Sequence, residues 1–200
     1  IMEDYSIGSN LSSSKAIVVD ALSPTVASVK STSTNTTYGT GASINITVNF
    51  SEAVSLSSGG SMTVTLETGS TNEGGTVSIT SISSATSASG TYTVRDGDAS
   101  GDLSVDSIAV SSGATLSDAV GNAMSDFLVP ADSNLSDFNA IIINTAKPST
   151  PTGFVVSSNY GSVGLAWTEI SGATYKVYRG TSTSAISLLT DTVTINSFTD

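Results

Sequence analysis

Apolar and polar residues alternate along much of the chain, which is the pattern of a β-strand with one buried face. The clearest case is residues 44–50, where every second residue is apolar and the residues between are Asn or Thr. The same pattern predicts further strands at 24–31, 62–66, 75–82, 91–94, 103–110 and 139–144. Clusters rich in Gly, Asn, Ser and Asp separate these segments and predict turns. Many short strands joined by turns indicate an all-β protein built from β-sandwiches.

Helical signals are weak throughout the chain. The best match is a short helical turn over residues 117–123, for which Ser117 or Asp118 would serve as the N-cap. We therefore expect helix to contribute little to the fold.

A motif near the N-terminus recurs later in the chain, with Asn10 repeated as Asn134. Each copy contains an apolar run, at 16–19 and again at 140–143. Such a run is typical of a strand that is covered on both sides or that closes a sheet edge. A repeat of this kind predicts tandem modules that end in the same way.

A proline follows each apolar run, Pro24 after the first copy and Pro148 after the second, and it would end strand pairing. We take each run as the last strand of a module and each proline as part of a linker. The predicted organisation is the end of one module (1–20), a complete module (21–147) and the start of a different module (148–200).

Charge excludes several classes of partner. The net charge is −11, from 17 Asp and Glu against 6 Lys and Arg, and the six basic residues are spread along the chain. Such a surface repels nucleic acid and anionic lipid, so we expect neither nucleic-acid binding nor direct membrane insertion. An acidic surface does permit divalent cations.

The chain contains neither cysteine nor histidine. Disulfides, thiolate or imidazole catalysis and sulfur- or imidazole-ligated metals are therefore excluded. Aromatic residues, which line sugar-cleaving sites, are only 6% of the chain. We expect a protein that is not an enzyme.

Several features favour an exported protein. A chain without cysteine but rich in Ser and Thr fits an extracellular bacterial surface protein better than a secreted animal protein. No apolar run approaches the roughly 18 residues that span a bilayer. The sequence starts at Ile1 and shows no signal peptide, so we expect targeting and anchoring signals to lie in flanking sequence.

The middle module resembles the Ig-like repeats of large bacterial surface proteins of the adhesin type. The matching segments, in order, are 24–26, 28–29, 38–41, 44–54, 66–69, 92–94, 97–98, 102–103, 117–123 and 140–144. The resemblance implies tandem Ig-like β-sandwich modules. Such repeats commonly end in an aspartate, which Asp20 retains and Asn144 replaces, so a linker metal site is expected at the first junction rather than the second.

From Pro148 onward the chain resembles a fibronectin type III module. The matching segments are 151–154, 163–167, 172–179 and 197–200. The resemblance implies that two closing strands are missing, which would leave an open sheet edge. Trp167 is expected to be a core residue of this module.

The densest acidic cluster is a candidate calcium site. Its sequence matches the first half of an EF-hand loop, in which oxygens at alternate positions converge on Ca²⁺ and a glycine makes the turn. Ser107 stands where the bidentate glutamate of that loop belongs, and strands rather than helices flank the cluster. The alternative is a polar turn without metal. The candidate ligands are Asp96, Asp98, Ser100, Asp102 and Asp106.

A second candidate calcium site lies at the first junction. Asp20 of the linker would meet carboxylates in turns of the following module, such as Glu52 or Asp118. Calcium bound there would fix the angle between consecutive modules. The alternative is that these are separate surface acids.

Three functions from different classes fit the sequence. The resemblance implies a spacer or stalk segment of a multi-domain adhesion protein, with neighbouring modules and host or cell-surface ligands as partners. The second is a subunit of a filament or surface layer, in which strand 16–19 completes the sheet of an identical subunit. The third is a carbohydrate-binding module of a secreted enzyme, which would need an exposed aromatic platform at Tyr160 or Tyr178.

Overall fold

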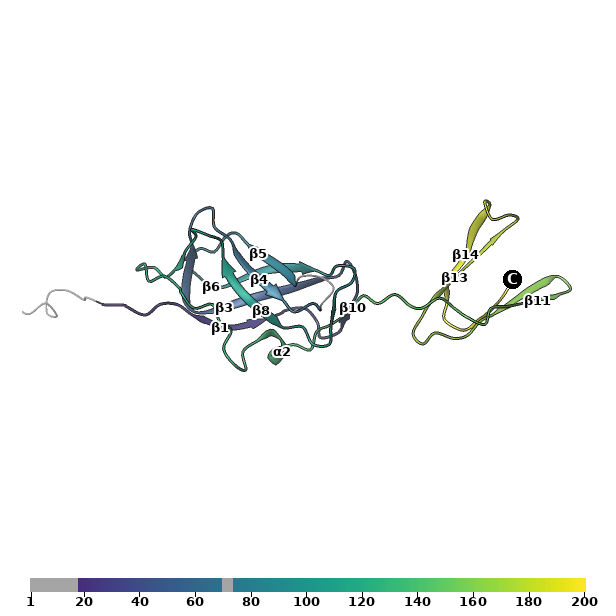
Figure 1. Ribbon diagram of the computed structural model, residues 1–200, viewed down its shortest axis with the longest axis horizontal. Helices are drawn as coiled ribbons and strands as arrows, with labels where there is room; N and C mark the ends of the chain where they lie inside the picture. The colour runs from purple at the N-terminus through teal and green to yellow at the C-terminus, as the bar shows by residue number, and fades with distance from the viewer. Residues whose placement is uncertain (1–17, 70–73) are drawn as a thin grey trace, which may run out of the picture. The chain divides into compact units, whose positions relative to one another are not determined.

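The structure is a computed structural model that describes residues 18–69 and 74–200. The chain forms two compact units, Ile1–Thr145 and Ala146–Asp200, here called the N-terminal unit and the C-terminal unit. The division lies next to the predicted module boundary at residue 148. Strands dominate both units (Figure 1), so the prediction of an all-β fold is confirmed.

Two antiparallel sheets form the body of the N-terminal unit. The first has the order β1-β3-β6, with β9 paired to the end of β3, and the second has the order β5-β4-β8. A small third sheet, β2-β10-β7, includes a parallel pair between β2 and β10. The strands are β1 (Val26–Lys30), β2 (Thr37–Tyr38), β3 (Ser43–Leu56), β4 (Met62–Leu66), β5 (Gly75–Ile79), β6 (Ala85–Thr93), β7 (Ala99–Ser100), β8 (Val105–Val110), β9 (Leu116–Ser117) and β10 (Ile142–Asn144).

The apolar residues of the two main sheets form one continuous core. Ile44, Ile46 and Val48 alternate along β3 and are fully buried. Met62 and Val64 of β4 are also fully buried in the same cluster. The alternation in the sequence therefore predicts which face of each strand is buried, because successive side chains of a strand point to opposite faces.

Close approach of the two sheets requires glycine at one position of β6. Gly90 pairs with Ile46 of β3, and a Cβ added to Gly90 would overlap the Cγ1 atom of Val77 in β5. Glycine at this position therefore lets the valine of the opposing sheet pack against the β6 backbone.

The helical turn predicted at 117–123 is wrong. This segment begins with β9 and continues as a turn, whereas the helix of the described region is α2 (Leu135–Phe138). Asn134 caps α2 in a capping box with Asp137, and its side chain also exchanges hydrogen bonds with the backbone of Val105 in β8. No helix within the described residues is long and apolar enough to cross a membrane.

The second copy of the repeated motif is thus a capped helical turn followed by β10. Ile141 and Ile143 are buried, but Ile142 is 40% exposed. The expectation of a strand covered on both sides is therefore wrong. β10 is instead paired along both edges, with β2 and β7, and buried on one face. Most of the first copy, including 16–17, lies outside the described residues.

The C-terminal unit contains two smaller sheets. One has the order β11-β12-β15, and the other is the pair β13-β14. Three of the strands fall on segments predicted from the resemblance, but the first begins at Val155, after the predicted 151–154. The strands are β11 (Val155–Asn159), β12 (Ser162–Ala166), β13 (Tyr175–Gly180), β14 (Ile186–Val193) and β15 (Ser197–Thr199).

Trp167 and Val177 are the two hydrophobic residues of the C-terminal unit that are buried, at 7% and 8% exposure. The Trp167 and Tyr175 rings meet edge to face, with centroids 4.9 Å apart. The Tyr175 hydroxyl accepts a hydrogen bond from the backbone N–H of Ile170 at 2.7 Å. Trp167 is therefore a core residue, as predicted, although the core around it is small.

Candidate metal centre

Asp118 is held by a tight turn directly after β9. One carboxylate oxygen, Oδ1, accepts backbone N–H groups from Val120, Gly121 and Asn122 at 2.9, 2.7 and 2.8 Å. The other oxygen, Oδ2, accepts the side-chain amide of Asn122 at 2.8 Å. Gly121 adopts φ of +97°, a conformation that side-chain-bearing residues rarely adopt. The sequence from 118 to 122 thus fixes one carboxylate in a defined orientation.

Glu52 reaches the same place because β3 is irregular there. The pairing of β3 with β6 shifts register between Asn49 and Val54, which frees this part of β3 from the regular ladder. The backbone N–H of Ser51 donates to the Thr25 carbonyl at 3.0 Å, and the Ser51 hydroxyl accepts the Thr25 N–H at 3.0 Å. The linker that precedes β1 is therefore attached beside Glu52.

Asp20 lies in that linker and completes the group. Its carboxylate accepts the backbone N–H of Leu22 at 3.1 Å, and its carbonyl accepts the side-chain amide of Asn122 at 3.3 Å. Asn122 therefore contacts both Asp20 and Asp118, which brings the linker to the turn after β9.

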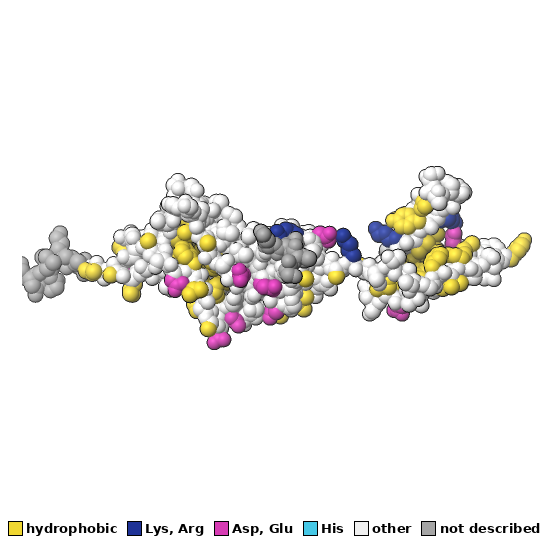
Figure 2. All heavy atoms as spheres, in the orientation of Figure 1, with side chains coloured by type: hydrophobic (Ala, Val, Ile, Leu, Met, Phe, Trp, Pro, Cys, Tyr) yellow, Lys and Arg dark blue, Asp and Glu magenta, His cyan; other side chains and the backbone are white. Residues whose placement is uncertain are grey.

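The three acids form a cluster, here called the acidic triad (Asp20, Glu52 and Asp118). One carboxylate oxygen from each lies within 4.8 Å of the others. Asp118 is buried, Glu52 is half-buried and Asp20 is exposed. No ion pair joins a triad residue to a Lys or Arg in the described part of the chain, and basic side chains are sparse on the visible face of the N-terminal unit (Figure 2).

The environment moves the pKa values of two triad members in opposite directions. Desolvation raises the pKa of Glu52 above its ordinary value, and the negative charges of Asp20 and Asp118 raise it further. For Asp118, desolvation alone would also raise the pKa, but the hydrogen bonds from Asn122, Gly121 and Val120 together lower it. Asp118 is therefore a stable anion, whereas desolvation and the two neighbouring charges disfavour the charged form of Glu52.

The donor set of the triad suits a hard cation. Carboxylate oxygens are the ligands that Ca²⁺ prefers, and Ca²⁺ tolerates irregular geometry with about six to eight oxygen ligands. Three carboxylates would supply part of that shell, and the exposed Asp20 side leaves room for water. Binding a divalent cation would also remove the repulsion among the three anions. The residues present therefore fit calcium.

The candidate site over residues 96–106 is not assembled in this way. Asp98 is buried, and its carboxylate accepts the Tyr92 hydroxyl and, at 2.6 Å, the backbone N–H of Arg95. It also lies 3.5 Å from the Arg95 guanidinium. This carboxylate is thus engaged in a buried network that holds the turn after β6.

The other members of that cluster differ from Asp98 in burial and contacts. The Ser100 hydroxyl donates to Glu67 at 3.1 Å, while Asp96, Asp102 and Asp106 are exposed. None of the five is part of the three-carboxylate group found among the described residues. Calcium binding at 96–106 stays a prediction without support from the geometry.

Comparison with known proteins leaves the family open. No model of a protein family matches the chain. A search of curated proteins found no significant relative. The resemblances to Ig-like and fibronectin type III modules therefore stay predictions that rest on the sequence motifs.

Proposed function

We propose that this chain is a structural spacer segment of a multi-domain extracellular bacterial protein related to adhesion, and that calcium in the acidic triad fixes the linker preceding the N-terminal unit. The observation that carries the proposal is the meeting of Asp20, from the linker, with Glu52 and Asp118, from the body of the unit. A cation bound there joins the linker to the sandwich.

The mechanical consequence follows from the contacts of the linker. Residues 18–25 contain no strand, and near the triad the linker is attached through the Asn122 amide and the Thr25–Ser51 hydrogen bonds. Hydrogen bonds of this kind contribute only about 0.5–1.5 kcal/mol each. Calcium would add strong oxygen contacts to both sides and remove the repulsion, so it would stiffen the entry into the module.

Composition and fold support the spacer role in a general way. The N-terminal unit is a β-sandwich whose strands expose mainly Ser, Thr and Asn, with acids in the turns and linker. The chain has no histidine or cysteine for nucleophilic catalysis. These features suit a module whose task is to hold other domains at a distance.

The test is thermal unfolding of the whole chain with calcium and with a chelator, together with calorimetric titration of Ca²⁺. A ligand that binds only the folded state contributes about 2.7 kcal/mol at a concentration 100-fold above its Kd. We expect the unfolding midpoint of the N-terminal unit to rise by roughly 5–10 °C in calcium.

Matched variants locate the ion. Asp118→Asn keeps an oxygen for the three backbone N–H groups but removes the charge, and Asp20→Asn alters an exposed side chain. Both should abolish the shift, whereas Asp102→Asn in the 96–106 cluster should leave it intact. An unchanged midpoint in the parent protein refutes the proposal. A shift lost only in Asp102→Asn would move the site to that cluster.

The two alternative functions are a filament subunit and a carbohydrate-binding module. For the filament, Val18 and Val19 are 88% and 85% exposed and unpaired with any strand in the described region, which is compatible with strand donation to another subunit. For the carbohydrate-binding module, Tyr160 is fully exposed in the β11–β12 turn, whereas Tyr178 lines a groove. The carbohydrate-binding module therefore stays a prediction.

A further inference from the structure

Two segments that are far apart in sequence run side by side through the N-terminal unit. Near their start, the backbone N–H of Val29 donates to the Ser133 carbonyl at 2.9 Å. Near their end, Tyr38 of β2 pairs with Ile143 of β10 in a parallel ladder. Residue numbers therefore rise in the same direction along both segments. The two segments, here called the closing seam, are residues 29–38 and 133–143.

Asn139 joins the closing seam through its side chain. Its Oδ1 atom accepts the backbone N–H of Ser31 at 2.9 Å, and its Nδ2 atom donates to the Ser31 carbonyl at 3.2 Å. The amide thus bonds both backbone groups of the residue directly after β1, as a residue of a neighbouring strand would. This pair attaches the C-terminal end of α2 to the first sheet.

Asn134, at the other end of α2, forms the same kind of pair with the second sheet. Its side chain bonds the N–H and the carbonyl of Val105 in β8 at 2.8 and 2.9 Å. Leu135, between the two asparagines, is fully buried. Because β1 and β8 are edge strands of their sheets, residues 133–139 fasten the edges of the two sheets to each other.

The parallel course of the closing seam determines how tension acts on it. β1 is the first strand of the unit and β10 is the last, and the chain enters beside β1 and leaves beside β10 (Figure 1). A pull on the two ends of the unit therefore drives the two segments in opposite directions along their common axis. The bonds between them run across that axis, so they share the load and must break together rather than one after another.

The exit from the closing seam is attached as well. The Thr145 hydroxyl accepts the backbone N–H of Gly97 at 3.0 Å and donates to the Asp98 carbonyl at 2.7 Å. Asp98 is buried, and its carboxylate accepts the Tyr92 hydroxyl. Tension from the following linker therefore meets this turn before it reaches β10.

We propose that the closing seam is the mechanical clamp of the N-terminal unit, the part that keeps the unit folded when the chain is stretched, with Asn134 and Asn139 as its anchoring residues. The inference rests on the proposed spacer function for its purpose, because a spacer must stay folded under tension, but it does not depend on calcium. It also gives a role to the repeated motif, whose second copy supplies residues 133–143.

The test is stretching of single molecules of the full chain, held at both ends at constant force in chelator. The lifetime of the folded N-terminal unit is measured, because forced unfolding is governed by the unfolding rate. We expect Asn139→Ala to shorten this lifetime by about 5–30-fold, as for the loss of two hydrogen bonds of ordinary strength. Asn139→Asp keeps an acceptor for the Ser31 N–H and should shorten it less.

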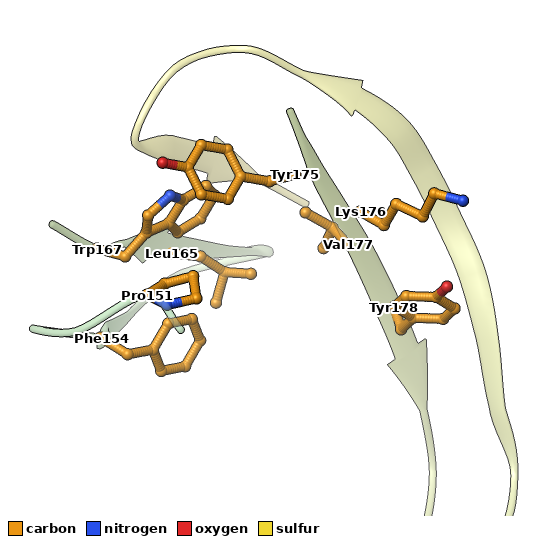
Figure 3. Close-up of a pocket in the computed structure, with 8 residues that line it drawn as sticks. All are labelled: Pro151, Phe154, Leu165, Trp167, Tyr175, Lys176, Val177 and Tyr178. Carbon is orange, nitrogen blue, oxygen red and sulfur yellow. The ribbon is translucent and has the colours of Figure 1, made fainter. Parts of the chain in front are cut away.

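The C-terminal unit supplies an internal marker for this experiment. Its apolar side chains gather between two small sheets, with Leu165 of β12 on one side and Val177 of β13 on the other (Figure 3). Trp167 and Val177 are the buried members. A unit with so small a core should unfold at lower force. Because this unit is the shorter one, its smaller gain in length distinguishes the two events.

Val77→Ala is the matched control. Val77 is a buried residue of β5, outside the closing seam, and its truncation should lower the free energy of unfolding in urea. Its contacts are still formed when the seam breaks, so the lifetime under force should stay that of the parent. Urea unfolding followed by far-ultraviolet circular dichroism shows whether each variant folds and how much equilibrium stability it has lost.

Two results overturn the proposal. If Asn139→Ala and Asn134→Ala keep the parent lifetime, the closing seam does not carry the load. If Val77→Ala shortens the lifetime as much as Asn139→Ala does, overall stability and not the seam sets the resistance. Because the stretching is done in chelator, failure of the seam and failure of the calcium-dependent shift in melting are separate outcomes.

Discussion

The N-terminal and C-terminal units share the same alternation of apolar and polar residues in sequence, but they bury their apolar residues to different degrees. In the N-terminal unit, buried apolar residues form one cluster that extends from β1 to β10. In the C-terminal unit, Trp167 and Val177 are buried while Phe154, Tyr178 and Leu188 stay exposed. Alternation of apolar and polar residues thus predicts strands in both, but it does not predict whether a second sheet covers them.

The difference comes from the number of strands that pair on both edges. β3 and β4 are central strands of two facing sheets, so each buries its apolar face against the other sheet. In the C-terminal unit β12 is a central strand, but it faces a hairpin of two strands. A unit of this size with few buried side chains has little stability of its own. We therefore expect two separate unfolding transitions.

The largest expected effect is on the N-terminal core. Ile46→Ala removes a fully buried side chain and should lower the free energy of unfolding of this unit by about 2–5 kcal/mol. Trp167 lies in the other unit, so its fluorescence should not change, and urea unfolding followed by far-ultraviolet circular dichroism should reveal the loss. If Trp167 fluorescence moved with the same midpoint, the two units would unfold as one.

The next effect concerns the capped turn that precedes β10. Asn134→Ala removes the N-cap of α2 and two hydrogen bonds to Val105. The expected loss is about 1–3 kcal/mol, because the cap contributes roughly 1 kcal/mol and unpaired backbone groups at Val105 add to the cost. Asn134→Asp retains a capping oxygen and should lose less. Equal losses in the two variants would contradict the role assigned to the cap.

A pH effect should be confined to the N-terminal unit. The folded-state pKa of Glu52 is raised, so its favourable contribution is present below its ordinary pKa and is lost as the pH rises through the raised value. In chelator, Glu52→Gln should therefore be more stable than the parent near pH 7, and the difference should vanish below about pH 4. Thermal melts across this range provide the measurement.

Asp118 should act in the opposite sense. Its pKa is lowered, so its contribution is present above its ordinary pKa and is lost as the pH falls through the lowered value.

Saturating calcium should reverse the Glu52→Gln result, because the variant loses a ligand. If Glu52→Gln were less stable than the parent even in chelator, repulsion within the acidic triad would be ruled out.

The smallest effect is expected in the C-terminal unit. Arg179 and Asp200 form an ion pair at 2.9 Å, with the arginine side chain 65% exposed. Exposed pairs contribute about 0.2–1 kcal/mol, so Arg179→Ala should shift the Trp167 fluorescence midpoint only slightly. A loss well above 1 kcal/mol would show that this pair, rather than Trp167 packing, holds the unit together.

The strand predictions succeeded where the signal was local, as at residues 44–50, because side-chain alternation is a direct consequence of strand geometry. The helical prediction at 117–123 failed for a local reason as well. Asp118 does satisfy free backbone N–H groups, as an N-cap would, but Gly121 at positive φ turns the chain instead of continuing a helix.

The two candidate metal sites show the limit of reading along the chain. The acids at 96–106 are neighbours in sequence, yet Asp98 is drawn inward to Tyr92 and Arg95, and Asp102 is exposed. The acids of the triad are far apart in sequence. Their meeting was predicted only because an acid of the linker was expected to lie near turn carboxylates of the following module. Asn122, which contacts both Asp20 and Asp118, was not predicted as a site residue. The sequence signal that could have identified it is its position directly after Gly121.

The sequence by itself determined the all-β class, the buried face of each main strand and the exclusion of histidine and cysteine chemistry, because these depend on residue type and on a period of two. Only the tertiary structure decided that Asp20, Glu52 and Asp118 converge and that two facing sheets bury one continuous core in the N-terminal unit. Both depend on which distant strands and turns pack together. That information lies in pairing and register, which no local pattern encodes.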